Sequence, residues 1–332
     1  MDPSPSGTDP ALGRDLDVVV VGAGVVGLSA ALALQATGRR VAIVTADAVS
    51  DTTSHVAAAV WFPTEVGPQD RVAVWGRHTF EVLSATARDH PAAGVLLRDT
   101  VMLYREPPGR PWWAAAVDGV RDARPEQLPP GYAHGLAFSV PLVEMPVHLA
   151  WLVARFTAAG GRLHRARLTS LRDLAGVAPV LVHCSGLGAR DLVGDTSVVP
   201  VRGQVVRTTN PGLTVSLRDQ HHPDGYTYVH PRTDDVVLGG TLEVGRSDLV
   251  PDPDVTAAIL ARCTALAPAL ADAEVIGAAV GLRPGRPTVR LEVDERTVPG
   301  TVVVHDYGHG GAGVTLAWGC AAEVVRLVEA RT

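Results

Sequence analysis

The chain has 332 residues, of which 46% are hydrophobic and 19% charged. This is enough apolar material for a sizeable core, and the length suits about two domains or one large two-part fold. The formal net charge of −6 argues against nucleic acid or an anionic membrane as the main partner. There is no lysine, which excludes a pyridoxal-phosphate Schiff base and a Walker-type phosphate loop, since both need a lysine amine.

Residues 1–14 are rich in proline, glycine and aspartate, so we expect a disordered leader and no secretory signal. The three cysteines, Cys184, Cys263 and Cys320, are far apart in sequence and show no C-x-x-C spacing. Their number and spacing argue against a disulfide framework or a zinc site and indicate a cytoplasmic protein. The histidines also lack the spacing of a metal motif, so we expect no bound metal.

The first ordered pattern is a βαβ unit. Residues 17–21 (DVVVV) predict a buried parallel strand, an alanine- and leucine-rich helix follows to about Gln35, and residues 41–45 (VAIVT) predict the second strand. The turn between the first strand and the helix has the spacing G-x-G-x-x-G, with glycines at 22, 24 and 27. Such a turn allows the backbone to approach a pyrophosphate, which is stabilised at the helix N-terminus.

An acidic residue about 20 positions after the glycines is expected to bind the ribose of a dinucleotide. Asp47 lies 20 residues after Gly27, just past the second predicted strand. The strand, the helix and this acid together predict a dinucleotide-binding fold. The motif itself does not distinguish NAD from FAD.

The middle of the chain has a different character. Residues 61–145 hold most of the tryptophans and many prolines, with short apolar runs such as 101–104. A buried strand is predicted at 180–183, and alternating apolar residues predict an antiparallel sheet further on. The predicted sheet strands are 204–208, 226–230 and 236–241, and the predicted helices are 147–158 and 254–268.

The C-terminal segment repeats the strand, glycine turn and helix order. Residues 301–305 (TVVVH) predict a strand, 307–313 (YGHGGAG) a glycine-rich turn, and the following residues an amphipathic helix to about Glu329. So many glycines allow the backbone to lie against a flat ligand, and the helix N-terminus behind them stabilises negative charge. The hydroxyl cluster Thr52, Thr53 and Ser54 is able to form hydrogen bonds to a phosphate, although, taken alone, the cluster is explained better by a solvated turn.

Nucleotide-type strands thus occur at the start, near the middle and at the end of the chain. We expect an α/β protein in which a Rossmann-like domain is interleaved with an α+β substrate domain built on an antiparallel sheet. The predicted nucleotide-binding domain is 15–60, 146–203 and 275–332, and the predicted substrate-binding domain is 61–145 and 204–274.

Four stretches in the same order resemble the D-amino-acid oxidase family. They are VVGAGVVGLS at 20–29, TTSHVAAAVWFP at 52–63, GLRPGRPTVRLE at 281–292 and VVHDYGHGGAGVTLAWGCA at 303–321. The resemblance covers nearly the whole chain from residue 17. It departs from the signature at Asp306, where the family usually has a neutral residue.

The resemblance implies a non-covalently bound FAD and the oxidative deamination of D-amino acids by O2 to 2-oxo acids, ammonia and hydrogen peroxide. It implies an amino acid and O2 as small-molecule partners, with no nucleic acid or membrane, and it leaves a homodimer open. Motifs and resemblance together assign the FAD contacts to Gly22, Ala23, Gly24, Val25, Val26, Gly27, Asp47, Thr52, Thr53, Ser54, Val60, Leu168, Ser185, Arg283, His309, Gly310, Gly311, Gly313 and Thr315.

An amino-acid carboxylate is best bound by the planar fork of an arginine. The resemblance assigns this role to Arg283 and a supporting hydroxyl to Tyr228, with the carbonyl of Gly311 accepting from the substrate amine. Tyr226 matches a second, mobile tyrosine, and Phe62 replaces a polar residue of the mammalian enzymes. No side chain is expected to act as a catalytic acid or base, since none is needed if the amine binds neutral.

Arg218 lies where D-aspartate oxidases carry an arginine for the acidic side chain. Those enzymes carry a second arginine soon after a Gly-Gly-Thr, and in this chain that position is Leu242. We therefore favour neutral D-amino acids, with D-aspartate or D-glutamate as the alternative.

Three further readings stay open at this point. The runner-up is a flavin oxidase of glycine or N-methyl amino acids, or a related dehydrogenase that passes electrons to a quinone. The GLRPGRP and HDYGHGG runs argue against it. For a nicotinamide dehydrogenase, the sequence lacks a convincing catalytic base or metal. A non-catalytic FAD-binding protein is disfavoured by Tyr228 and Arg283.

Overall fold

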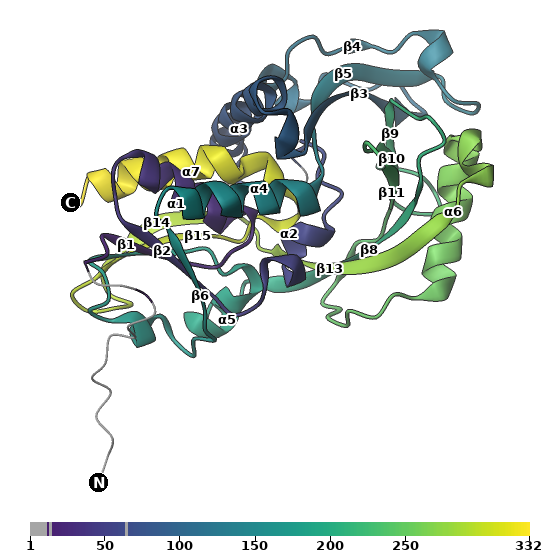
Figure 1. The fold of residues 1–332 in the computed structure, drawn as a ribbon. Coiled ribbons are helices and arrows are strands. Elements are labelled where there is room, and N and C mark those ends of the chain that lie inside the picture. Colours follow the sequence, from purple (N-terminus) through teal and green to yellow (C-terminus); the bar gives the residue numbers. More distant parts are fainter. Residues whose placement is uncertain (1–11, 13–14, 64–65) are drawn as a thin grey trace.

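The computed structural model describes residues 12, 15–63 and 66–332 and contains two sheets that lie side by side, each with its own helices (Figure 1). The predicted α/β class is confirmed. Of the predicted leader, only Leu12 is described, and it is buried against the strands of the first sheet; the other leader residues lie outside the described part. The first sheet has the order β14 (Arg290–Asp294), β15 (Val302–Tyr307), β7 (Val180–His183), β1 (Val18–Val21), β2 (Val41–Thr45) and β6 (Arg162–Arg165).

The five strands from β15 to β6 run parallel, and only β14 pairs antiparallel. The largely apolar strands β1, β2 and β7 are buried along their whole length, as the valines of β1 and β7 predict, whereas the edge strand β6 is partly exposed. Helix α1 (Val25–Ala36) crosses from β1 to β2 and packs against α7 (Gly313–Glu329) and α4 (Met145–Ala158). The βαβ unit and the C-terminal strand and helix are therefore confirmed, and they meet in one layered body.

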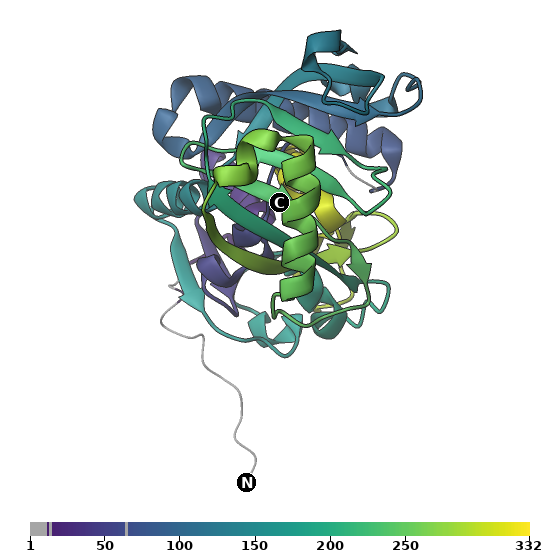
Figure 2. The same ribbon diagram turned by 90° about the vertical axis from the view of Figure 1, so that its right-hand side faces the viewer.

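The second sheet is large and mostly antiparallel, with α6 (Pro253–Leu266) packed on its outer face (Figure 2). Strand β13 (Val275–Gly285) pairs with β8 outside the main strand order. That order is β12 (Glu243–Val244), β8 (Val199–Thr209), β11 (Asp235–Gly239), β10 (Thr227–Pro231), β9 (Ser216–Asp219), β3 (Val95–Tyr104), β5 (His134–Val143) and β4 (Arg121–Asp122).

The chain alternates between the two sheets. The first sheet takes strands from the start, the middle and the end of the chain, which agrees with the expected interleaving. Strand β13 belongs to the second sheet, although the predicted boundary at residue 275 assigned it to the nucleotide-binding part. The domain boundaries themselves remain a prediction.

Helix α3 (Gln69–Asp89) is not among the predicted elements, yet it is a long helix that packs on α7 and β3. Its buried residues Val72, Trp75, Thr79 and Leu83 recur at three- and four-residue spacing, which is the pattern of an amphipathic helix. No proline interrupts residues 69–89, so this periodicity could have predicted the helix from the sequence. The segment Gly310–Glu329, which contains α7, is long and apolar enough to cross a membrane, but 56% of its apolar window is buried inside the protein, as in a core helix.

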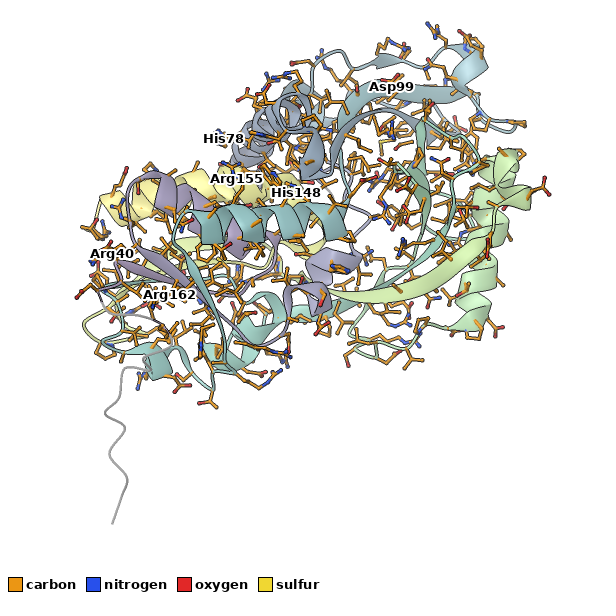
Figure 3. The ribbon with its side chains drawn as sticks, in the orientation of Figure 1. Arg40, His78, Asp99, His148, Arg155 and Arg162 are labelled. Carbon is orange, nitrogen blue, oxygen red and sulfur yellow. The ribbon has the colours of Figure 1, made fainter. Side chains whose placement is uncertain are left out.

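His148 of α4, labelled in Figure 3, is a buried histidine that should make the fold sensitive to acid. Its Nδ1–H donates to the carbonyl of Ala93 at 2.8 Å. Burial lowers the pKa of His148 from 6.5 to about 4, although the bond to Ala93 acts in the opposite direction. Between these two pH values His148 is mostly protonated in the unfolded chain but mostly neutral in the folded protein. The free energy of unfolding therefore decreases as the pH is lowered, by up to about 1.4 kcal/mol per pH unit.

We therefore expect His148→Asn, which keeps a donor for Ala93, to flatten the fall in unfolding free energy between pH 6.5 and 4. Denaturant unfolding at half-unit pH steps measures this slope. The exposed His78 on α3 provides the matched control, His78→Asn (Figure 3). An unchanged acid slope in His148→Asn would show that other buried groups, such as His183 and His305, account for the acid sensitivity.

Candidate active site

A cavity of about 800 Å³ extends between the two sheets and is lined by residues of both. One end is formed by the glycine turn after β1, and the other by the side chains of β10 and β13. This volume lies within the range of small-molecule and cofactor sites. The cavity therefore joins the predicted nucleotide motif to the predicted substrate residues.

The glycine turn has the backbone that a dinucleotide needs. Gly22 has φ +112°, and a Cβ on it would lie 2.4 Å from the carbonyl oxygen of Cys184. A Cβ on Gly27 would lie 2.0 Å from the carbonyl oxygen of Gly22, so this glycine allows α1 to pack on the turn. Gly22, Gly24 and the residues between and after them (Ala23, Val25, Val26) line the cavity, whereas Gly27 does not. The position of Gly27 therefore suits the packing of α1 on the turn and not a contact with a ligand.

The predicted hydroxyl cluster lies beside the N-terminus of α1. The Ser54 hydroxyl accepts from the backbone N–H of Val25 at 3.0 Å, so it is in direct contact with the first turn of the helix. Thr53 donates to the carbonyl of Leu282 and Thr52 to that of Val49. All three line the cavity and keep lone pairs for further donors.

Asp47 lines the same end of the cavity, where its carboxylate accepts from Arg167 at 2.8 Å. Leu168 and Ser185 also line the cavity. The Ser185 hydroxyl forms a hydrogen bond with Nε2 of His183 at 2.7 Å. An acidic residue after β2 is able to bind a ribose hydroxyl, and an apolar residue in the same cavity is able to contact an adenine ring. The position of Asp47 therefore agrees with the predicted nucleotide contact.

The C-terminal glycine turn forms the wall of the cavity at the start of α7. Gly310 has φ +53°, which favours glycine, and Gly310, Gly311 and Gly313 all line the cavity. His309 is buried there, and its Nε2 lies 3.3 Å from the carboxylate of Asp306. A cavity lined both by a pyrophosphate-type glycine turn and by the glycines before α7 fits FAD.

Asp306, the residue that departs from the family signature, is fully buried and is among the residues that line the cavity. Its carboxylate also accepts from the thiol of Cys184 at 4.0 Å. Asp306, His309 and Cys320 form a buried group with potential metal-ligand atoms within 4.8 Å of one another. Asp306 Oδ1 and His309 Nε2 lie close together but make no hydrogen bond, and the absence of a metal remains a prediction.

Arg283 lies on β13 and lines the cavity near the glycine wall. Its Nη1 donates to the backbone carbonyl of Thr241 at 3.1 Å. A Cβ on Gly311 would lie 3.5 Å from Cδ of Arg283, so the arginine passes directly beside the glycine turn. The structure thus brings Arg283 and Gly311 together, as predicted.

Tyr228 on β10 is buried and faces the same space as Arg283. Its ring stacks on His230 with a centroid distance of 4.6 Å. Burial raises the pKa of Tyr228, although the nearby guanidinium groups of Arg283 and Arg218 oppose the shift. The phenol therefore stays protonated at neutral pH and is able to donate a hydrogen bond.

Arg218 is a buried cation in the wall of the cavity. Its guanidinium lies 4.1 Å from the ring centre of Phe62 and 5.1 Å from that of Tyr226, so it packs between two aromatic residues. Burial lowers the pKa of Arg218 to about 10, which leaves it charged at neutral pH. Phe62 and Tyr226 line the cavity with it, as does Val60.

Thr315, a predicted FAD contact, forms hydrogen bonds with the backbone of Phe62 in the structure. Its hydroxyl accepts from the backbone N–H of Phe62 at 3.0 Å and donates to the Phe62 carbonyl at 2.9 Å. It is buried and does not line the cavity. Its place on α7 therefore fixes Phe62 in the wall.

Gly203, Thr241 and His230 belong to the site but are not among the predicted site residues. Gly203 and His230 line the cavity, and Thr241 accepts from Arg283. Burial lowers the pKa of His230 well below its usual value, so its ring is neutral. His230 belongs to the predicted strand 226–230, and the alternation of side chains along that strand could have indicated that His230 faces the cavity. No comparable pattern in the sequence indicates Gly203 or Thr241.

Comparison with known proteins agrees with this geometry. The family model described as "FAD dependent oxidoreductase" matches residues 17–327. The chain is 51% identical to the D-amino-acid oxidase of Rubrobacter xylanophilus over 94% of this chain and 95% of that protein. It is 40% identical to the human D-aspartate oxidase over 94% of each chain.

Among solved structures, the glycine oxidase of Geobacillus kaustophilus has the same fold, with a TM-score of 0.80 over 96% of this chain and 95% of that one at 21% identity. That identity is too low to transfer an activity. The match to the family model, by contrast, covers both sheets and the cavity between them. The chain therefore belongs to the FAD dependent oxidoreductase family.

Proposed function

We propose that this protein oxidises D-amino acids with FAD and O2, giving 2-oxo acids, ammonia and hydrogen peroxide. The observation that carries the proposal is the convergence of Arg283, Tyr228 and Gly311 on one part of the cavity, beside the glycine wall. A forked cation and a neutral phenol form a suitable pair for an α-carboxylate. The similarity to D-amino-acid oxidase over nearly the whole chain supports the same activity.

In this proposal Arg283 and Tyr228 bind the carboxylate, while the carbonyl of Gly311 accepts from the amine. The three groups fix the orientation of the substrate, and such positioning contributes several kcal/mol to catalysis. FAD, when bound, supplies the redox chemistry by accepting hydride from Cα and delivering the electrons to O2. The resulting imino acid is hydrolysed by water.

No acid or base on the protein is needed if the amine binds neutral. The nearest titratable groups agree with this: the Tyr228 phenol holds its proton, and the His230 ring is neutral because both are buried. Their role is to present a fixed hydrogen-bonding surface. The acceptor O2, the peroxide product and a cytoplasmic location are parts of the proposal that rest on the resemblance and the composition.

For the side chain of the substrate, we favour neutral groups. Phe62, Tyr226 and Val60 form an apolar and aromatic wall of the cavity. Leu242, which also lines the cavity, stands where a second arginine would be needed for an acidic substrate. An apolar wall of this kind binds hydrocarbon side chains by removing them from water.

A second candidate, the oxidation of acidic D-amino acids, is favoured by one observation. Arg218 places a buried positive charge in the cavity in addition to Arg283. The human D-aspartate oxidase is among the relatives of the chain. A second carboxylate on the substrate would bring a counter-charge to this cation.

A substrate panel decides between the two side-chain classes. Peroxide release is measured with D-alanine, D-valine, D-aspartate, D-glutamate, glycine and N-methylglycine, in the parent protein and in Arg218→Met. We expect kcat/KM to be highest for a neutral D-amino acid and to survive in Arg218→Met. Highest kcat/KM for D-aspartate or D-glutamate, lost in Arg218→Met, would replace the favoured class by the second; preference for glycine or N-methylglycine would overturn both.

A further inference from the structure

The guanidinium of Arg283 lies directly on the backbone of β8, at Gly203. A Cβ added to Gly203 would lie 2.2 Å from Nη1, 2.4 Å from Nη2 and 2.5 Å from Cζ of Arg283. These distances are far shorter than any carbon–nitrogen contact between non-bonded atoms. The present position of the guanidinium therefore exists only because residue 203 has no side chain.

The pairing of β13 with β8 sets up this contact. Arg283 is opposite Val201, and Gly281 is opposite Gly203, so the arginine side chain reaches along β8 by two positions to lie over the glycine. The Thr241 carbonyl then accepts from Nη1, and the Thr241 hydroxyl accepts from the backbone N–H of Gln204. The residue next to Gly203 thus also anchors the acceptor of Arg283.

Within the described part of the chain, the Arg283 guanidinium makes one hydrogen bond, to Thr241. The other N–H groups of its fork are left for a ligand in the cavity. The hydrogen bond to Thr241 and the close approach of the guanidinium to the Gly203 backbone favour one orientation of the fork. A preoriented fork loses less rotamer entropy on binding a carboxylate than a mobile one.

Tyr228 shows the same arrangement on the neighbouring strand. A Cβ on Gly239 of β11 would lie 2.0 Å from Cζ of the Tyr228 ring and 2.2 Å from its hydroxyl oxygen. Strands β8 and β11 are paired, so the two glycines lie on adjacent strands of one sheet. Both side chains proposed to bind the carboxylate thus pack directly against the backbone of a glycine.

We infer that Gly203 is a positioning residue for substrate binding. Because it has no side chain, it leaves the space in which the Arg283 guanidinium lies when it binds the substrate carboxylate. The inference rests on the proposed function. It predicts that any side chain at 203 displaces the guanidinium and weakens carboxylate binding while the FAD site is retained.

Gly203→Ala tests this directly. Gly203 is not among the glycines with positive φ, so alanine is compatible with its backbone. The atoms that the new Cβ would meet are the far end of a flexible side chain, which is able to move away. We therefore expect a folded protein with FAD bound and an unfolding temperature within a few degrees of the parent.

Two readouts are expected to change in Gly203→Ala. The dissociation constant of benzoate, a carboxylate that cannot be oxidised, is measured from the perturbation of the flavin spectrum and should rise at least tenfold. KM for the preferred D-amino acid should rise similarly, with a smaller change in kcat. Gly109→Ala is the control, because a Cβ there meets no atom within 4 Å, and both constants should stay at parent values.

The double variant Gly203→Ala/Arg283→Ala distinguishes an effect of Gly203 on the position of Arg283 from a general structural role of Gly203 in the sheet. If Gly203 acts through Arg283, adding Gly203→Ala to Arg283→Ala changes benzoate binding no further. Should Gly203→Ala alone lose FAD, recovery of FAD in the double variant would support the contact, since the displaced group is then absent. Parent-like benzoate binding in Gly203→Ala, additive effects in the double variant, or loss of FAD in both would overturn the inference.

Failure of the proposed function is recognised separately. In that case the parent protein itself would oxidise no D-amino acid. The inference about Gly203 would still be decided by benzoate, whose binding does not depend on turnover.

Discussion

Arg283→Ala should retain FAD and lose most of its activity, with kcat/KM reduced about 100-fold or more. Truncation of one partner of a buried, hydrogen-bonded charge pair costs about 3 kcal/mol, which corresponds to this factor. The sequence also assigns Arg283 as an FAD contact, but the glycine turn after β1 and the C-terminal glycines are unchanged in this variant, so FAD should still bind. Steady-state kinetics and the flavin-to-protein absorbance ratio measure the two effects.

Tyr228→Phe is the companion to this variant. It removes one hydroxyl and keeps the stack on His230, so the expected loss is of the order of 1 kcal/mol, or about fivefold in kcat/KM. A larger loss in Tyr228→Phe than in Arg283→Ala would make the tyrosine, and not the arginine, the main carboxylate ligand. Unchanged kinetics in Arg283→Ala would refute the role of that arginine.

Gly22→Ala should abolish FAD binding. The φ of +112° is a region that alanine rarely adopts, and the new Cβ would lie 2.4 Å from the backbone carbonyl oxygen of Cys184. The strain alone costs about 1–3 kcal/mol, and the clash is with a backbone atom just after β7, which cannot rotate away. The turn that faces the pyrophosphate must therefore move, and the purified protein should be colourless.

Gly38→Ala is the matched control for this variant. Gly38 follows the end of α1 and also has positive φ, +83°, but a Cβ on it would meet no atom within 4 Å. The variant should lose about 1 kcal/mol of stability and keep FAD. Stoichiometric FAD in Gly22→Ala would contradict the assignment of this turn to the cofactor.

The nucleotide-binding half of the fold could be predicted because its signals are local. The valine run of β1, the glycines at 22, 24 and 27 and the helix α1 follow one another within twenty residues. Each has a direct physical reason, which is burial, a tight turn or close packing. The same holds for β15, the C-terminal glycines and α7.

The second sheet was predicted less completely because its pairing is not local. Strand β3 pairs with β9 across more than a hundred residues, and β13 reaches back to β8. The sequence of β13 contains small residues and a proline without clear alternation, so its motif was assigned to the nucleotide-binding part that follows it in sequence. Only the pairing shows that it carries Arg283 into the cavity from the other sheet.

The site shows the same division. Arg283, Tyr228 and the glycines are recognisable from their motifs, and the structure places them around one cavity. Gly203 could not be recognised, because its contribution is the absence of a side chain at a place fixed by a strand 80 residues later. Thr315 was assigned to the cofactor, but the direction of its side chain depends on how α7 packs on Phe62.

The central claim is that the cavity holds a D-amino acid by its carboxylate beside FAD. Anaerobic mixing of the purified protein with D-alanine or L-alanine, followed by the blue absorption band of the flavin, tests it most directly. The proposed function predicts that the D-isomer bleaches the band and that admission of air restores it with the release of peroxide, while the L-isomer has no effect. Bleaching by L-alanine, or by neither isomer nor any other D-amino acid, would contradict it.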